Sequence, residues 1–210
     1  MSRSRRKINI PVKSRCAIVV EGETELWYVN MIKRNNRNLG LAISPSMIVK
    51  KSIDEQIKHI KKLAEIYDQV FWIVDLDVIM NESLLQARHD NKPITKLRAF
   101  TQHCEDELDN VQIIINHPCI EYWFLVHYQN TSPHFTNCDE AGIRLKRHLP
   151  EYEKTEKFFT NPRNDIYMRM LDTLPNAISY SESLGEFDID NPRRGLTQMH
   201  RLINGLKLLD

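Results

Sequence analysis

The sequence contains little glycine and few cysteines, and it has no long apolar run. Of its 210 residues 6 are glycine, 41% are hydrophobic and 27% are charged, which is typical of a folded globular protein and not of a fibrous or disordered one. No apolar stretch approaches the roughly 18–20 residues of a membrane span. The length suits one domain, or one domain with an appendage, and allows a sizeable core.

The four cysteines are too far apart in the sequence to predict a cysteine site. Cys16, Cys104, Cys119 and Cys138 form no C-x-x-C pair, whereas a zinc site would need closer pairing and a disulfide framework a denser set. The N-terminus is basic but lacks the apolar stretch of a signal peptide. We therefore expect reduced thiols in a cytoplasmic protein.

An excess of charge of one sign is also absent. The formal net charge is +1, so an acidic partner would have to bind a local patch. Residues 1–14 form one candidate, a basic arm of the kind that binds phosphate backbones. A solvated, flexible tail is an equally common role for such a segment.

Strands and helices alternate through the first 130 residues. Apolar runs predict strands at 16–21, 42–49, 70–75 and 111–115, and helical periodicity predicts helices at 23–35, 53–67, 94–108 and 119–128. Ser52 and Glu55 have the spacing of a capping box, and Pro118 suits the first position of its helix. Residues 78–92 are polar and are expected to form a loop. This alternation predicts an α/β fold with a mostly parallel sheet flanked by helices.

After residue 130 the pattern favours helices alone, at 138–148, 163–172 and 195–208, with a connection rich in Gly, Pro and Asp at 183–195. The predicted organisation is therefore an arm at 1–14, an α/β domain at 15–130 and a C-terminal helical extension at 131–210 that packs on it.

Acidic residues follow the two strongest strands. Glu21 ends the first, and Asp75 ends the second, with Asp77 two residues later. Ligands of parallel sheets bind at the carboxyl ends of the strands. If the two strands are neighbours, and if the second continues to Asp77, all three carboxylates converge.

Carboxylates that lie so close repel one another unless a cation is present. An all-oxygen ligand set suits Mg²⁺ or Mn²⁺, so the sequence predicts a site for one of these metals. The alternative is that these acids end their strands facing water, which is common for a single D-x-D but less expected when a second strand also ends in an acid.

Several segments, in order, resemble the RloB-like proteins, a branch of the Toprim superfamily. They are "IVVEGETELWYV", "FWIVDLDV" and "INHPCIEYWFLVHY", followed by "LPEYEKTEKFF" and "NPRRGLTQMHRLI". The resemblance covers most of the chain from about residue 16. It implies a compact Toprim-like α/β fold with Glu21, Asp75 and Asp77 as metal-binding acids.

The resemblance also implies roles for Glu25 and Lys154, and the position of Glu121 after the third strong strand makes it a further candidate. Glu25 would match a second acid of the nuclease branch. Lys154 would approach the charge that develops on a phosphate; the alternative, which is the more common role, is a solvated lysine among the 29 basic residues. Glu121 could be a further ligand or an orienting acid, or simply an acid that the dipole favours at a helix N-terminus.

These features predict a nuclease that depends on Mg²⁺ or Mn²⁺ and hydrolyses phosphodiesters of DNA or RNA, transfer RNA included. RloB-like proteins are often associated with a partner ATPase in bacterial anti-phage loci. An effector of abortive infection that acts with an AAA- or ABC-type ATPase is thus implied, and no P-loop motif occurs in this chain. The alternative is a catalytically silent binding or regulatory subunit of such a complex. The sequence leaves the oligomeric state open, a homo-oligomer included.

Overall fold

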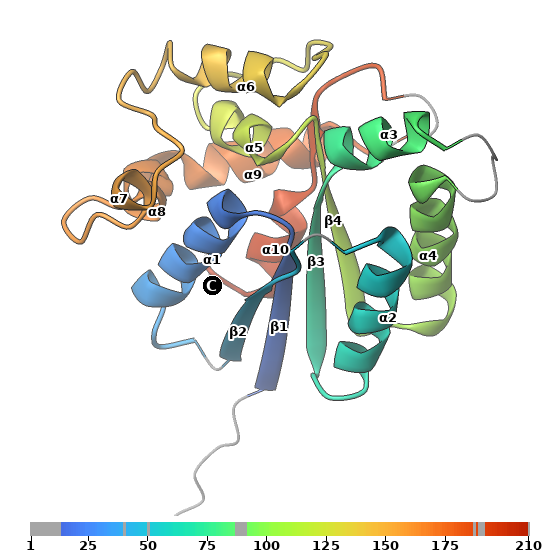
Figure 1. Cartoon of the computed structure of the whole chain (residues 1–210). Coiled ribbons are helices and arrows are strands. Elements are labelled where there is room, and N and C mark those ends of the chain that lie inside the picture. Colours follow the sequence, from blue (N-terminus) through green and yellow to red (C-terminus); the bar gives the residue numbers. More distant parts are fainter. Residues whose placement is uncertain are drawn as a thin grey trace, which may run out of the picture.

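A computed structural model describes residues 14–39, 41–49, 51–86, 92–186, 188 and 192–209. Figure 1 shows a central sheet with helices on both faces. The predicted basic arm at 1–14 lies outside the described residues except for Ser14, which begins the first strand.

Five strands form one sheet in the order β2-β1-β3-β4-β5. The first four are parallel, and β5 is antiparallel to β4. The strands are β1 (Ser14–Val20), β2 (Leu41–Met47), β3 (Gln69–Asp75), β4 (Val111–His117) and β5 (Leu196–Thr197). The prediction of an α/β fold with a mostly parallel sheet is therefore confirmed.

The two faces of the sheet supply two separate cores. Successive side chains of a strand point to opposite faces, so Ile18 and Val20 join one core while Ala17 and Val19 join the other. Because both faces are buried, β1 reads as a continuous apolar run and not as an alternating one.

Helix α1 and the helices after β4 cover one face of the sheet, and the helices between β2 and β4 cover the other (Figure 1). The first core receives side chains from α1 (Glu23–Asn35), α5 (Ile120–Val126), α6 (Cys138–Leu145), α7 (Glu156–Phe159), α8 (Ile166–Met170), α9 (Leu174–Ser183) and α10 (Met199–Gly205). The second receives them from α2 (Ile53–Ala64), α3 (Leu76–Leu84) and α4 (Pro93–Glu107). In the described residues, no helix combines the length and the apolarity needed to cross a membrane.

Three local predictions are wrong. Residues 78–84, predicted as part of a loop at 78–92, belong to α3, because Leu76 and Ile79 are one helical turn apart and both are buried. The region after residue 130 is not purely helical, since β5 adds a strand too short to produce a sequence pattern. Pro118 is not the first residue of α5, which begins at Ile120 with Cys119 as its N-cap. The capping box of Ser52 and Glu55 is confirmed at the start of α2.

A polar contact attaches the C-terminal helices to α1. The guanidinium of Arg34 donates to the carbonyl oxygen of Thr160 at 2.9 Å and pairs with the carboxylate of Asp165. Asp165 is fully buried and also accepts the backbone N–H of Met168 at 2.9 Å as the N-cap of α8. Asn35 donates to it as well, at 2.9 Å. This contact fixes α8 against the end of the helix that carries Glu25.

Candidate functional site

The strand order places the predicted acids at one edge of the sheet. β1 and β3 are adjacent and parallel, so Glu21, directly after β1, and Asp75, the last residue of β3, lie at neighbouring carboxyl ends. The next strand, β4, pairs Asn116 with Asp75 and leads into α5, which carries Glu121. The condition that the first two strands be neighbours is thus met.

A glycine makes room for the acid at the start of α1. Gly22 is the N-cap of this helix, and Glu25, in its first turn, is only 6% exposed. A Cβ atom at position 22 would lie 2.6 Å from Oε2 of Glu25, well inside contact distance. The E-G-x-x-E spacing therefore folds the Glu25 carboxylate back over the backbone of residue 22.

Asp75 and Asp77 do not share a strand face, contrary to the condition set above. The strand ends at Asp75, which is the N-cap of α3, and Asp77 already belongs to the first turn of that helix. The N–H of Asp77 donates to the carbonyl oxygen of Pro118 at 3.1 Å, and its carboxylate accepts the backbone N–H of Cys138. The change of backbone conformation turns Asp77 toward the segments around α5 and α6.

Burial and mutual repulsion raise the pKa values of these acids. Burial, then the charges of Glu25 and Glu121, raise the pKa of Asp75 well above its ordinary value. Burial also raises the pKa of Glu25, whose carboxyl lies within hydrogen-bond reach of that of Asp75. Two carboxyl groups can form such a bond only if one carries a proton. Both carboxyl groups are therefore harder to ionise in the metal-free protein than in water.

The other two acids are perturbed in the same direction. Burial and the Glu25 carboxylate raise the pKa of Glu21 to about 8. Burial raises the pKa of Asp77 even though the backbone N–H groups of Val78 and Cys138 stabilise its charged form. All four carboxyl groups are thus less acidic than in water, as expected when like charges gather at a partly dry site.

Unsatisfied oxygens show that the acids fit a hard cation. Within the described part of the chain, no donor reaches Oε1 of Glu21, Oε2 of Glu25 or Oδ1 of Asp75, although all three atoms are buried. Buried polar atoms are rarely left without a partner in proteins. Carboxylate oxygens are the ligands that Mg²⁺ and Mn²⁺ prefer, so the donor set has the right chemistry for these ions.

The acids do not, however, form one compact shell. Glu21, Asp75 and Asp77 do not bring three ligand atoms within 4.8 Å of one another, whereas Cys119, Glu121 and Cys138 do. Mg²⁺ commonly binds through one or two carboxylates and keeps several waters, and this spacing leaves room for them.

Glu121 lies at the centre of a second set of contacts. Its side chain is 1% exposed, and its Oε1 accepts hydrogen bonds from Lys154 Nζ at 2.7 Å and from the Tyr152 hydroxyl at 2.8 Å. Burial works against the charge of Lys154, but the Glu121 carboxylate outweighs it and raises the pKa of the lysine. Lys154 remains half-exposed, so Glu121 presents a fixed ammonium group beside the acids.

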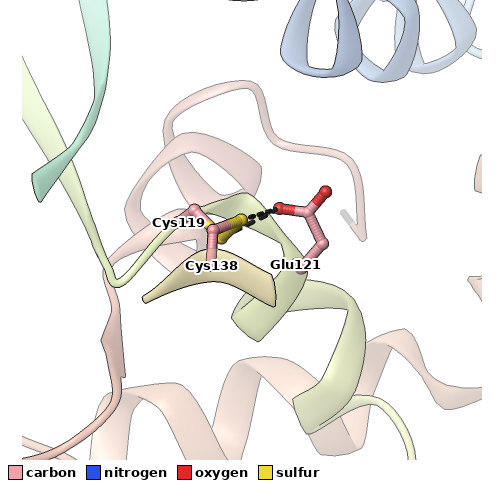
Figure 2. A group of neighbouring side chains, drawn as sticks. All are labelled: Cys119, Glu121 and Cys138. Atoms are coloured by element: carbon pink, nitrogen blue, oxygen red, sulfur yellow. Dashed lines mark hydrogen bonds between the residues drawn. A yellow bond between two sulfur atoms is a disulfide. The ribbon is translucent and has the colours of Figure 1, made fainter. Parts of the chain in front are cut away.

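The other oxygen of Glu121 faces sulfur. Cys119 and Cys138 form a disulfide that joins the start of α5 to the start of α6, and both sulfurs lie 2.9 Å from Oε2 of Glu121 (Figure 2). The expectation of four reduced thiols is wrong for this pair. The two cysteines are 19 residues apart in the chain, and only the packing of α6 on α5 brings them together. Cys16 and Cys104 are free and buried, as expected.

The roles of two residues in the site, Tyr152 and Gly22, were not predicted from the sequence. Tyr152 supports Glu121, and its only signal is its position two residues before Lys154 on a segment of charged residues. Gly22 was recognisable as part of E-G-x-x-E, but its steric role could be seen only once the position of the Glu25 side chain was known.

Comparison with known families gives a match over most of the chain. The family model described as "RloB-like protein" matches residues 16–206, a range that includes every residue of the candidate site. No curated protein and no solved structure shows a significant match.

Proposed function

Because the chain belongs to the RloB-like protein family, we propose that it is a metal-dependent nuclease with a Toprim-type carboxylate site. The observation that carries this proposal is the set of buried, unpartnered oxygens of Glu21, Glu25 and Asp75 at adjacent carboxyl ends of a parallel sheet. A fold does not by itself identify a function, so the proposal rests on the chemistry of these groups.

Glu21, Asp75 and Asp77, with Glu25, would hold Mg²⁺ or Mn²⁺. When bound, such an ion polarises a phosphodiester and neutralises the charge that develops on its oxygens. The charge of the ion would also relieve the repulsion that raises the four pKa values.

The chain's own groups supply the remaining chemistry. Lys154 is half-exposed and held by Glu121 at 2.7 Å, so its ammonium can donate to a phosphate oxygen. A positioned donor of this kind is most effective when charge builds up in the transition state. Glu25 would remain a ligand of the ion together with Asp75.

The biological setting belongs to the same proposal. The substrate is DNA or RNA, and the protein acts as an effector of bacterial anti-phage defence together with an AAA- or ABC-type ATPase. This part is supported by the family resemblance and by the absence of a P-loop motif in the chain, since any ATP hydrolysis would have to come from a partner.

A cleavage assay with a matched variant tests the proposal. Plasmid, single-stranded DNA and total transfer RNA are incubated with the protein and Mg²⁺ or Mn²⁺, with and without a partner ATPase. Asp75→Asn should abolish cleavage while its melting curve stays cooperative. Asp106→Asn, a change of the same type at an exposed position of α4, should cut like the wild type.

Two results would contradict the proposal. Cleavage by Asp75→Asn at the wild-type rate would exclude a reaction at this site. Binding of Mn²⁺ and nucleic acid without cleavage of any substrate, with or without the ATPase, would instead identify the chain as a silent binding or regulatory subunit.

A further inference from the structure

The disulfide leaves a buried carboxylate oxygen without a suitable partner. Oε2 of Glu121 contacts the sulfurs of Cys119 and Cys138 at 2.9 Å, and within the described chain these are its contacts. A disulfide sulfur carries no proton, so it cannot donate a hydrogen bond to that oxygen. The same three atoms become a complementary set if the sulfurs are thiols or thiolates.

We propose that the reduced form of this pair, with Glu121, is a binding site for a soft divalent cation, Zn²⁺ in the first instance. This site uses other ligands than the carboxylate site, and its test does not depend on the proposed nuclease activity. Thiolate and carboxylate ligands are both common for zinc, at about 2.3 Å for sulfur and about 2.0–2.2 Å for oxygen. Mg²⁺ prefers oxygen ligands alone, so the two sites would select different ions.

The geometry agrees with this assignment. The three ligand atoms lie within 4.8 Å of one another, and two sulfurs in a tetrahedral zinc site are about 3.8 Å apart. The Cα atoms of the two cysteines are 5.6 Å apart, so the sulfurs can reach that separation by side-chain rotation. Three protein ligands leave a fourth position for water, which is common for zinc.

The surroundings of Glu121 also match those of a metal ligand. Ligating carboxylates are typically held by hydrogen bonds from neighbouring groups, and Oε1 is held by Lys154 and Tyr152 while Oε2 faces the sulfurs. Two thiolates, one carboxylate and Zn²⁺ sum to one negative charge. The ammonium of Lys154, 3.5 Å from the sulfur of Cys138, balances it.

The site forms in two steps that balance. A dithiol reductant such as dithiothreitol takes the disulfide by thiol exchange, which leaves two thiols on the protein and a disulfide on the reductant. Zn²⁺ then replaces the two thiol protons, which are released to solvent. The bound ion would join α5 to α6, as the disulfide does, and would keep Glu121 in place.

Co²⁺ titration of the full-length reduced protein tests the proposal, because cobalt bound by thiolate gives a charge-transfer band in the near ultraviolet. Dithiothreitol is removed under anaerobic conditions before the metal is added. We expect one equivalent of Co²⁺ to produce the band, and Zn²⁺ to abolish it by displacement. Cys138→Ser should weaken binding at least about 100-fold, whereas Cys104→Ser, at a buried free cysteine, should leave it unchanged.

Two further measurements keep the test decisive. Asp75→Asn should retain the cobalt band, which separates this site from the carboxylate site. In the wild type, Zn²⁺ should protect Cys119 and Cys138 from alkylation measured by peptide mass spectrometry, whether or not any variant folds. A reduced wild type that gives no thiolate band, or a band that survives in folded Cys138→Ser, would overturn the proposal, and the pair would then be a disulfide only.

Discussion

The raised pKa of Glu21 predicts that metal-free protein loses stability as the pH rises. Burial and the Glu25 carboxylate move this pKa from 4.5 to about 8. Above pH 4.5 the unfolded chain releases the proton, while the native protein retains it until about pH 8. The unfolded state therefore binds fewer protons across this window, and the free energy of unfolding falls with rising pH.

Glu21→Gln removes the titration while keeping the shape of the side chain. At 1.36 kcal/mol for each pH unit, the variant should exceed the wild type by about 2 kcal/mol at pH 6 and by as much as about 5 kcal/mol at pH 8.5. Near pH 4 the two proteins should be equal, because the wild-type carboxyl is then neutral in both states.

Urea denaturation in EDTA at these three pH values measures the effect. The control is Glu23→Gln, an exposed acid in the first turn of the same helix, whose loss should cost no more than about 1 kcal/mol through the helix dipole. Parallel stability curves for Glu21→Gln and wild type would refute the reasoning, because they would mean that Glu21 ionises as freely in the folded protein as in water. Addition of Mn²⁺ at pH 8.5 should stabilise the wild type more than the variant, by mass action on the folded state.

Three further changes probe the other parts of the site and its support. Gly22→Ala would place a Cβ 2.6 Å from Oε2 of Glu25, so calorimetry should show Mn²⁺ affinity reduced at least about 10-fold with cooperative melting retained; unchanged affinity would exclude Glu25 as a ligand. Lys154→Met should lower kcat about 100-fold with little change in KM, and a wild-type kcat would make the lysine a surface residue. Asp165→Ala removes the cap of α8 and the partner of Arg34, so urea denaturation should show a loss of about 2–4 kcal/mol; a loss below about 1 kcal/mol would mean that this contact is dispensable.

The sequence was sufficient to predict the position of the acids along the sheet. The apolar runs before Glu21 and Asp75 are long and uninterrupted, and alternation with helices implies parallel strands. Parallel strands place their carboxyl ends at one edge, so both acids were expected at the same edge, but their proximity depended on the strand order, which only the structure shows. The same reasoning identified the region of Glu121, which follows the next strand.

The sequence was not sufficient to predict how each carboxylate is directed. Asp77 was expected on the same strand face as Asp75, because a D-x-D that follows an apolar run suggests that the strand continues. Instead, β3 ends at Asp75 and α3 begins at the next residue. That passage is set by the burial of Leu76 and Ile79 against the second core, a tertiary effect that outweighs local pattern. The pairing of Cys119 with Cys138 is likewise a product of packing between α5 and α6.

The cluster of acids lowers the stability of the metal-free protein, because its carboxylates are buried and repel one another. A buried, unpaired carboxylate lowers stability, and this edge concentrates several of them without a cation from the described chain close enough to pair with Glu21 or Asp75. The one ammonium held in the cluster, that of Lys154, is bound to Glu121. A fold with cores on both faces of its sheet can tolerate such strain locally. The proposed divalent cation would supply the positive charge that the described residues do not bring to Glu21 and Asp75.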